Sequence, residues 1–161
     1  MINPYGTPDN FRAYVYSQIV LAWETQYKHM ISPVYAPKTL EAACPPLQIM
    51  MLDTLDKVED ESKKQGNNLN DEFLVFHRAT KGYECLFKRL RDTFAHGHYT
   101  QQKSDLIEIM HKYQGTKDKT ERIRIFGQLK ITTLESLVSF LKSVDVNTRN
   151  MIQQNQAKKA R

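Results

Sequence analysis

Apolar residues recur at intervals of three and four along much of this 161-residue chain, and this spacing constrains the fold more than any other feature. Between residues 11 and 26 the apolar positions form two interleaved stripes, which predict a helix from a cap at Asp9 to about Met30. Gly and Pro number only six each, so long helices have few interruptions. The wide apolar face of this first helix indicates a place in the core or at a subunit interface.

The same spacing predicts further helices. A short helix is expected over 38–43, a longer one from Pro45-Pro46 to about Gln65, and one of about seven turns from residue 70 or 71 to residue 94 or 96. Gly97 stands where a C′ glycine ends a helix. A last core helix is predicted to begin at Thr132-Thr133, where Glu135 provides a capping partner.

A β-hairpin is expected before that last helix. Its arms, 103–113 and 121–129, flank a polar turn, and the first arm also fits a short helix. The predicted fold class is therefore mainly α: a bundle of four to five helices with a β-hairpin inserted before the last core helix. We expect a single domain over 1–161, with a core over about 9–146 and a frayed tail over about 147–161.

Composition narrows the function classes. The net charge of +5 permits attraction to a polyanion without requiring it. The only cysteines, Cys44 and Cys85, have no zinc-site spacing, which favours a reduced environment. The N-terminus does not resemble a signal peptide, and no run of about 18 apolar residues predicts a membrane span. By elimination, we expect a soluble cytoplasmic protein that does not contact a membrane.

The densest group of reactive side chains lies between Arg89 and Tyr99, where two arginines, an aspartate, a threonine, two histidines and a tyrosine occur together. A guanidinium grips phosphate oxygens through a planar fork, and an imidazole exchanges protons near neutral pH. No group of carboxylates is present to hold two metal ions, and no cofactor motif is apparent. The segment therefore predicts phosphodiester chemistry without a metal or a cofactor.

Arg91 and His96, with Asp92 directly after the arginine, resemble the R-x4-6-H motif of the HEPN superfamily (higher eukaryote and prokaryote nucleotide-binding domains). The resemblance is sharp over 90–97, and the expected order of elements extends it loosely over about 10–145. Members of this superfamily are helical bundles, and many are metal-independent endoribonucleases that act as dimers in toxin–antitoxin, antiphage or RNA-processing roles. The resemblance thus implies an RNA substrate, a homodimer with a composite Arg/His site, and an antitoxin protein as a partner.

Carried over to this chain, the resemblance implies that Arg91 binds the scissile phosphate, that His96 is the general acid or base, and that Asp92 orients one of them. The RNA would be cleaved by attack of its 2′-hydroxyl, leaving a 2′,3′-cyclic phosphate. Further residues are expected to support this site or to bind RNA, namely His98, Tyr99, Arg89 and Thr93. The spacing also admits the pairs Arg91 with His98 and Arg89 with His96, so the identity of the motif pair stays open.

Two other functions also stay open. One is a non-catalytic dimer of the same fold that binds a protein, a nucleotide or RNA, and the other is a nucleic-acid-binding module. An Arg91 locked in an internal ion pair would favour the non-catalytic dimer, whereas an open basic cleft would favour the nuclease. His77 is expected on a helix and His111 on the surface of the hairpin. The hairpin's cations form either a basic arm along RNA or a solvated surface: Lys117, Lys119, Arg122, Arg124 and Lys130.

Overall fold

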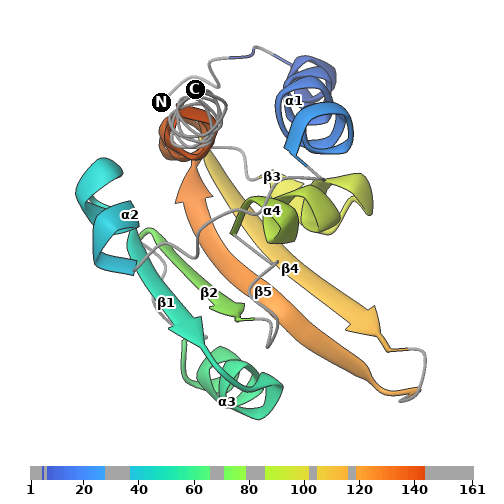
Figure 1. Cartoon of the computed structure of the whole chain (residues 1–161), viewed down its shortest axis with the longest axis vertical. Helices are drawn as coiled ribbons and strands as arrows, with labels where there is room; N and C mark the ends of the chain where they lie inside the picture. The colour runs from blue at the N-terminus through green and yellow to red at the C-terminus, as the bar shows by residue number, and fades with distance from the viewer. Residues whose placement is uncertain are drawn as a thin grey trace, which may run out of the picture.

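A five-stranded mixed sheet forms the centre of the molecule (Figure 1). The computed structural model describes residues 5, 7–27, 37–65, 71–78, 86–101, 105–115 and 119–143. The strands lie in the order β1-β2-β5-β4-β3. Their bounds are β1 Gln48–Leu52, β2 Phe73–His77, β3 Tyr99–Gln101, β4 Leu106–Gln114 and β5 Glu121–Lys130.

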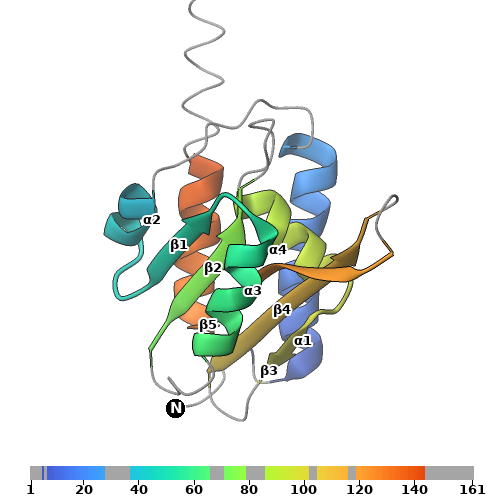
Figure 2. The same cartoon turned by 90° about the horizontal axis from the view of Figure 1, so that it is seen from below.

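Among the described residues, one face of the sheet is covered by helix α3 (Leu55–Lys64), which lies between the parallel strands β1 and β2 in the chain. The helix begins after Thr54, whose hydroxyl oxygen accepts a hydrogen bond from the backbone N–H of Lys57 at 3.3 Å. Its buried side chain, Val58, packs with Val75 and Phe126 in a small core. Figure 2 shows α3 on this side of the sheet, opposite α1, α2 and α4.

The opposite face carries the larger core and most of the helices (Figure 2). The N-terminal helical stretch consists of α1 (Pro8–Val15) and two π-helical segments, η1 (Tyr16–Leu21) and η2 (Trp23–Tyr27). Helix α2 (Pro37–Ala43) lies against β1, and α4 (Leu86–Ala95) packs between η1 and strands β4 and β5. A helix over 131–143 follows β5 directly. This core includes Phe11, Ile19, Phe87, Leu90, Ile107, Ile125 and Leu134.

The N-terminal helix was predicted correctly as an element, but its cap and its winding differ from expectation. Thr7, not Asp9, is the N-cap residue. The buried side chains then recur every fourth residue: Phe11, Val15, Ile19, Trp23 and Tyr27. A spacing of four drifts by roughly 40° per step around an α-helix. The wider π-helical turns reduce that drift, so these residues stay directed toward the core.

The predicted mainly α bundle with an inserted hairpin is wrong, because two of the predicted helices contain strands that join the hairpin in one mixed sheet. The segment expected to be helical from Pro45 to Gln65 forms strand β1 and then α3. Within 48–52 the apolar residues are consecutive, and such a short run fits a buried strand and a helix equally well. Pairing with β2 decides between them, since the strand gains a complete backbone ladder there.

The long helix predicted over 70–96 is wrong in its first part for a related reason. Residues Phe73–His77 form β2, which lies between β1 and β5, and α4 is described only from Leu86. Leu74 and Phe76 enter the large core, whereas Val75 enters the small one. A strand that is covered on both faces has a continuous run of apolar residues, so the alternation of apolar and polar residues that identifies a strand is missing.

Several expectations are confirmed. The hairpin forms as β4 and β5, the short helix forms as α2, and the last helix spans 131–143. Gly127 on β5 has φ +156°, and a Cβ there would lie 2.1 Å from the carbonyl oxygen of Phe73, so only glycine allows β5 to approach β2. Cys85 and the predicted tail over 147–161 lie outside the described residues.

Candidate active site

The end of α4 positions the first two histidines of the site. Gly97 has φ +67°, as predicted for a C′ glycine. Its N–H donates to the carbonyl oxygen of Phe94 at 3.2 Å, and the N–H of His98 donates to that of Thr93 at 2.9 Å. These two bonds are those of a Schellman motif, which reverses the chain sharply. His96 and His98 therefore stand on either side of the turn.

Pairing of β3 with β4 brings in a third histidine. The backbone N–H of Met110 donates to the carbonyl oxygen of His98 at 3.1 Å, and Tyr99 pairs with Ile109. His111 follows Met110 on β4 and lies on the same face as Ile107 and Ile109, which enter the large core. Its side chain is only 3% exposed. The hairpin therefore carries His111 under the end of α4.

We call His96, His98 and His111 the histidine cluster. The ring centroids of His98 and His111 are 4.8 Å apart, and those of His96 and His111 are 5.5 Å apart with the rings within 18° of parallel. The Nδ1 atoms of His98 and His111 lie 2.8 Å apart, at hydrogen-bond distance. One of these two nitrogens must therefore carry a proton and the other a lone pair.

The surroundings of His111 indicate its charge. Burial lowers the pKa of His111 to about 4; His98, His96 and Arg89 add to this lowering, and Asp92 opposes it. His111 is therefore neutral at physiological pH, so its ring carries one N–H and one lone pair. Whichever Nδ1 atom carries the proton, the contact occupies Nδ1 of His98 and leaves its Nε2 as the nitrogen that can meet a ligand.

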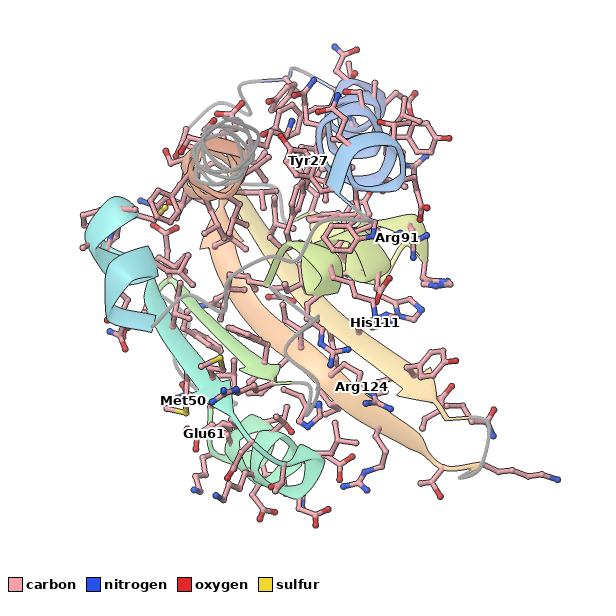
Figure 3. All side chains as sticks on the ribbon, in the orientation of Figure 1. Tyr27, Met50, Glu61, Arg91, His111 and Arg124 are labelled. Atoms are coloured by element: carbon pink, nitrogen blue, oxygen red, sulfur yellow. The ribbon has the colours of Figure 1, made fainter. Side chains whose placement is uncertain are left out.

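Arg91 lies beside this cluster but is occupied. It pairs with Glu24 of η2, and its Nη1 donates to Oδ1 of Asp92 at 2.7 Å. Burial by itself lowers the pKa of Arg91, but the hydrogen bonds and charges of Asp92 and Glu24 outweigh this and raise it. We call Glu24, Arg91 and Asp92 the ion-pair triad. Figure 3 shows Arg91 on the side of α4 that faces the N-terminal helix.

The remaining predicted residues have structural contacts. Arg89 is 5% exposed and donates to the carbonyl oxygen of His77 at 3.3 and 3.4 Å. Thr93 is fully buried and donates to the carbonyl oxygen of Arg89 at 2.8 Å. Tyr99 packs on Phe94, with ring centroids 5.1 Å apart. His77 itself is on strand β2, not on a helix as expected.

Two surface hollows meet at the turn after α4. The first, which we call the sheet hollow, has a volume of about 590 Å³ and lies over the part of the sheet next to α3; its lining includes His98, Met110, Phe73 and Phe126. The second, the helix groove, has a volume of about 1220 Å³ and separates the N-terminal helix from β3; its lining includes His96, Tyr16 and Arg12. His98 thus opens into one hollow and His96 into the other.

The structure places Arg91 and Asp92 in one contact network and His96 and His98 in another, and each network includes a residue that sequence reasoning missed. His111 was assigned to the hairpin surface and is instead buried at the centre of the cluster. The alternation Ile107, Ile109, His111 along the hairpin arm was a signal that could have placed it on the core face. Glu24 carries no comparable signal, because its approach to Arg91 depends on how the helices pack.

The chain matches no protein-family model, and no curated protein or solved structure is significantly similar to it. The resemblance to the HEPN superfamily therefore depends on the motif residues alone. Within the described ranges, no three histidine, cysteine or carboxylate side chains are arranged to hold a metal ion. Among the same residues, no helix is long and apolar enough to cross a membrane.

Proposed function

We propose that this protein is a metal-independent endoribonuclease whose acid and base are the imidazoles of His98 and His96. The observation that carries the proposal is the 2.8 Å contact between the Nδ1 atoms of His98 and His111. A buried, neutral imidazole that shares a hydrogen bond with Nδ1 of His98 holds that ring in one orientation. Such a contact is typical of a histidine that exchanges protons through its other nitrogen.

The chemistry needs two proton transfers and no other reactant. One imidazole takes the proton of a ribose 2′-hydroxyl as the 2′ oxygen forms a bond to phosphorus. The second imidazole gives a proton to the 5′ oxygen as its bond to phosphorus breaks, leaving a 2′,3′-cyclic phosphate. His98 and His96 open into adjoining hollows on either side of one turn, an arrangement suited to a base and an acid on opposite sides of a phosphate.

His111 acts in this proposal as a positioning residue. It touches His98 through the hydrogen bond and His96 through the stacked ring, so it orients both. One chain therefore contains both proposed catalytic imidazoles, and the chemistry does not need a composite site. The homodimer, the antitoxin partner and the toxin or defence role expected from the sequence stay predictions.

A cleavage assay tests the proposal. Purified protein is mixed with labelled RNA of mixed sequence in EDTA, beside His98→Ala, His96→Ala and His77→Ala as a control histidine outside the cluster. We expect cyclic-phosphate products that are lost or reduced at least about 100-fold in the first two variants and kept in the control. Cleavage that survives both substitutions would exclude this site.

A non-catalytic RNA-binding protein is the second candidate, and the ion-pair triad favours it. A guanidinium already neutralised by two carboxylates contributes little to holding a phosphate, which is the role that the motif implies for Arg91. This alternative predicts RNA binding that weakens with salt, without turnover under any condition. The same assay separates the two functions, because the RNA would stay intact with the wild-type protein.

A further inference from the structure

The half of the β4–β5 hairpin that extends beyond the helices carries a second arrangement of exposed side chains (Figures 1 and 3). Tyr113 is 48% exposed although it is a large aromatic residue. The guanidinium carbon of Arg124 lies 5.6 Å from the centroid of its ring. An aromatic ring and a stacked guanidinium form the kind of platform on which an unpaired base stacks.

A β-bulge places Arg124 in this position. His111 pairs with Ile125 and Lys112 pairs with Ile123, so Arg124 is the extra residue of β5 between two regular pairs. Its neighbour Ile125 is the partner of His111, and Tyr113 follows His111 by two residues, about 7 Å along the strand. The platform is therefore adjacent to the histidine cluster.

The two arginines of this segment differ in a way that indicates a ligand for only one of them. Arg122 is held by two carboxylates of α3, Glu59 at 2.6 Å and Asp56. Arg124 has no ion pair among the described residues, and its Nε is buried without a hydrogen-bond partner. Arg122 therefore fixes the hairpin to α3, whereas the charge of Arg124 stays available.

The charge around the platform favours a polyanion. Among the described residues of this part of the hairpin, the cations Lys112, Lys119 and Arg124 outnumber the acid Glu121. A phosphate backbone would therefore be attracted to it, and the exposed ring of Tyr113 offers a surface for one base. Double-stranded RNA keeps its bases stacked inside the duplex, so only a single strand can use this surface.

We propose that Tyr113 and Arg124 form a subsite for single-stranded RNA, in which Tyr113 stacks one base and Arg124 contacts an adjacent phosphate. The inference depends on the proposed function only in taking RNA as the ligand. It assigns to Arg124 the phosphate contact that the sequence motif implied for Arg91. It also predicts that the chain binds single strands with little regard to their sequence, since every base has a face that can stack.

Equilibrium binding to an RNA that cannot be cleaved tests this subsite. The probe is a fluorescein-labelled 12-mer of mixed sequence with 2′-O-methyl groups, which lacks the attacking hydroxyl, and the readout is fluorescence anisotropy. We expect Tyr113→Ala to weaken binding about tenfold and Tyr113→Phe to keep it, because stacking needs the ring and not the hydroxyl. Met50→Ala is the matched control, since Met50 is a large apolar residue that is 40% exposed but lies on the edge strand β1, outside both hollows.

Arg124→Ala provides an independent measurement. We expect the slope of log affinity against log salt to decrease by about 0.7, the value for one phosphate contact on a single strand, and Arg124→Lys to restore most of it. A purely structural role for Arg124 would not change that slope. The same oligomer annealed to its complement should bind much more weakly than the single strand.

The outcomes separate this subsite from the nuclease. The subsite would be overturned if the wild-type protein did not bind the 12-mer, or if Tyr113→Ala and Arg124→Ala both bound it with wild-type affinity. Equal affinity for the single strand and the duplex would also overturn it. Binding that depends on Tyr113, together with no cleavage of ordinary RNA, would leave the subsite and remove the nuclease. Cleavage that depends on His98 but not on Tyr113 would support the nuclease and argue against the subsite.

Discussion

The ion-pair triad and the histidine cluster lie side by side at the end of α4, but they differ in what they leave open. In the triad, the two terminal nitrogens of Arg91 pair with Glu24 and Asp92, and its side chain is 28% exposed. In the histidine cluster only His111 is buried, and His96 and His98 both reach surface hollows. The triad therefore stabilises the junction of two helices, whereas the cluster offers reactive nitrogens to a ligand.

The difference teaches that closeness in sequence does not make two reactive residues partners. Positions five apart on an α-helix are separated by about 140° around its axis, so Arg91 and His96 start on different faces. Arg91 turns toward the N-terminal helix, where Glu24 meets it. His96 lies past the last residue of α4 and stacks on a residue of β4 instead. The two residues of the motif thus differ in role: Arg91 stabilises the packing of two helices, whereas His96 is accessible to a ligand.

The largest effect expected from this comparison is on RNA cleavage. His98→Ala should lower the single-turnover rate at least about 100-fold, because it removes a proton-transfer group. Arg91→Lys should leave the rate near the wild-type value, because a lysine keeps the charge between the two carboxylates and Arg91 does not meet the RNA. Rates are measured in EDTA at a temperature where circular dichroism shows both variants folded. Equal losses in the two variants would mean that the triad belongs to the active site.

The next largest effect concerns stability against pH. The pKa of His111 is lowered to about 4, below the ordinary value of 6.5 that it has when unfolded. Between pH 4 and pH 6.5, His111 is therefore protonated in the unfolded chain but neutral in the folded chain. The contribution of neutral His111 to the free energy of unfolding is fully present above pH 6.5 and is lost as the pH falls toward 4. The loss should reach about 3 kcal/mol.

His111→Gln tests this directly, because glutamine does not titrate and can keep one hydrogen bond to His98. Urea unfolding at several pH values should show a smaller decrease below pH 6.5 in the variant than in the wild type. His98, His96, Asp92 and Arg89 face His111 and are retained in both proteins. Parallel curves for the two proteins would contradict a neutral, buried His111.

A somewhat smaller effect is expected from opening the triad. Arg91→Ala should lower the free energy of unfolding by about 2 kcal/mol, because it leaves two partly buried carboxylates without their cation. Glu24→Gln should cost less, and the double variant should show a coupling energy of about 1 kcal/mol between the two residues. Chemical denaturation of the four proteins gives this cycle. Strictly additive effects would mean that the contact between Arg91 and Glu24 contributes nothing to stability.

The sequence predicted the elements whose signals are local and missed those that depend on pairing. The hairpin was found from the alternation in its second arm, and the last helix from its cap and apolar stripe. Strands β1 and β2 are only five residues each, and their apolar runs carry no alternation that separates a strand from a helix. Their parallel pairing connects residues about 25 positions apart, for example Met50 with Val75.

The same distinction applies to the candidate site: its local residues were predicted, and those that folding brings to it were not. The segment from Arg89 to Tyr99 was identified because a place in the core or on the surface does not by itself explain so many reactive side chains. Gly97 was identified because the signal for a helix cap is local. His111 and Glu24 come from a strand and a helix that reach α4 only in the folded chain. The roles of Arg91 and His98 follow from those two partners, which no local pattern contains.

The smallest effect is expected from Gly97, in the turn after α4 that positions the histidine cluster but not the ion-pair triad. Gly97→Ala should cost about 1 kcal/mol, because its φ of +67° is unfavourable for a residue with a Cβ, although no atom lies within 4 Å of that Cβ. Gly97→Asn should cost less, since asparagine tolerates this conformation. The change acts on the positions of His96 and His98, not on the triad, which precedes the turn. Thermal unfolding of the two variants measures the cost, and a loss of several kcal/mol for Gly97→Ala would indicate that the space beside the turn is filled.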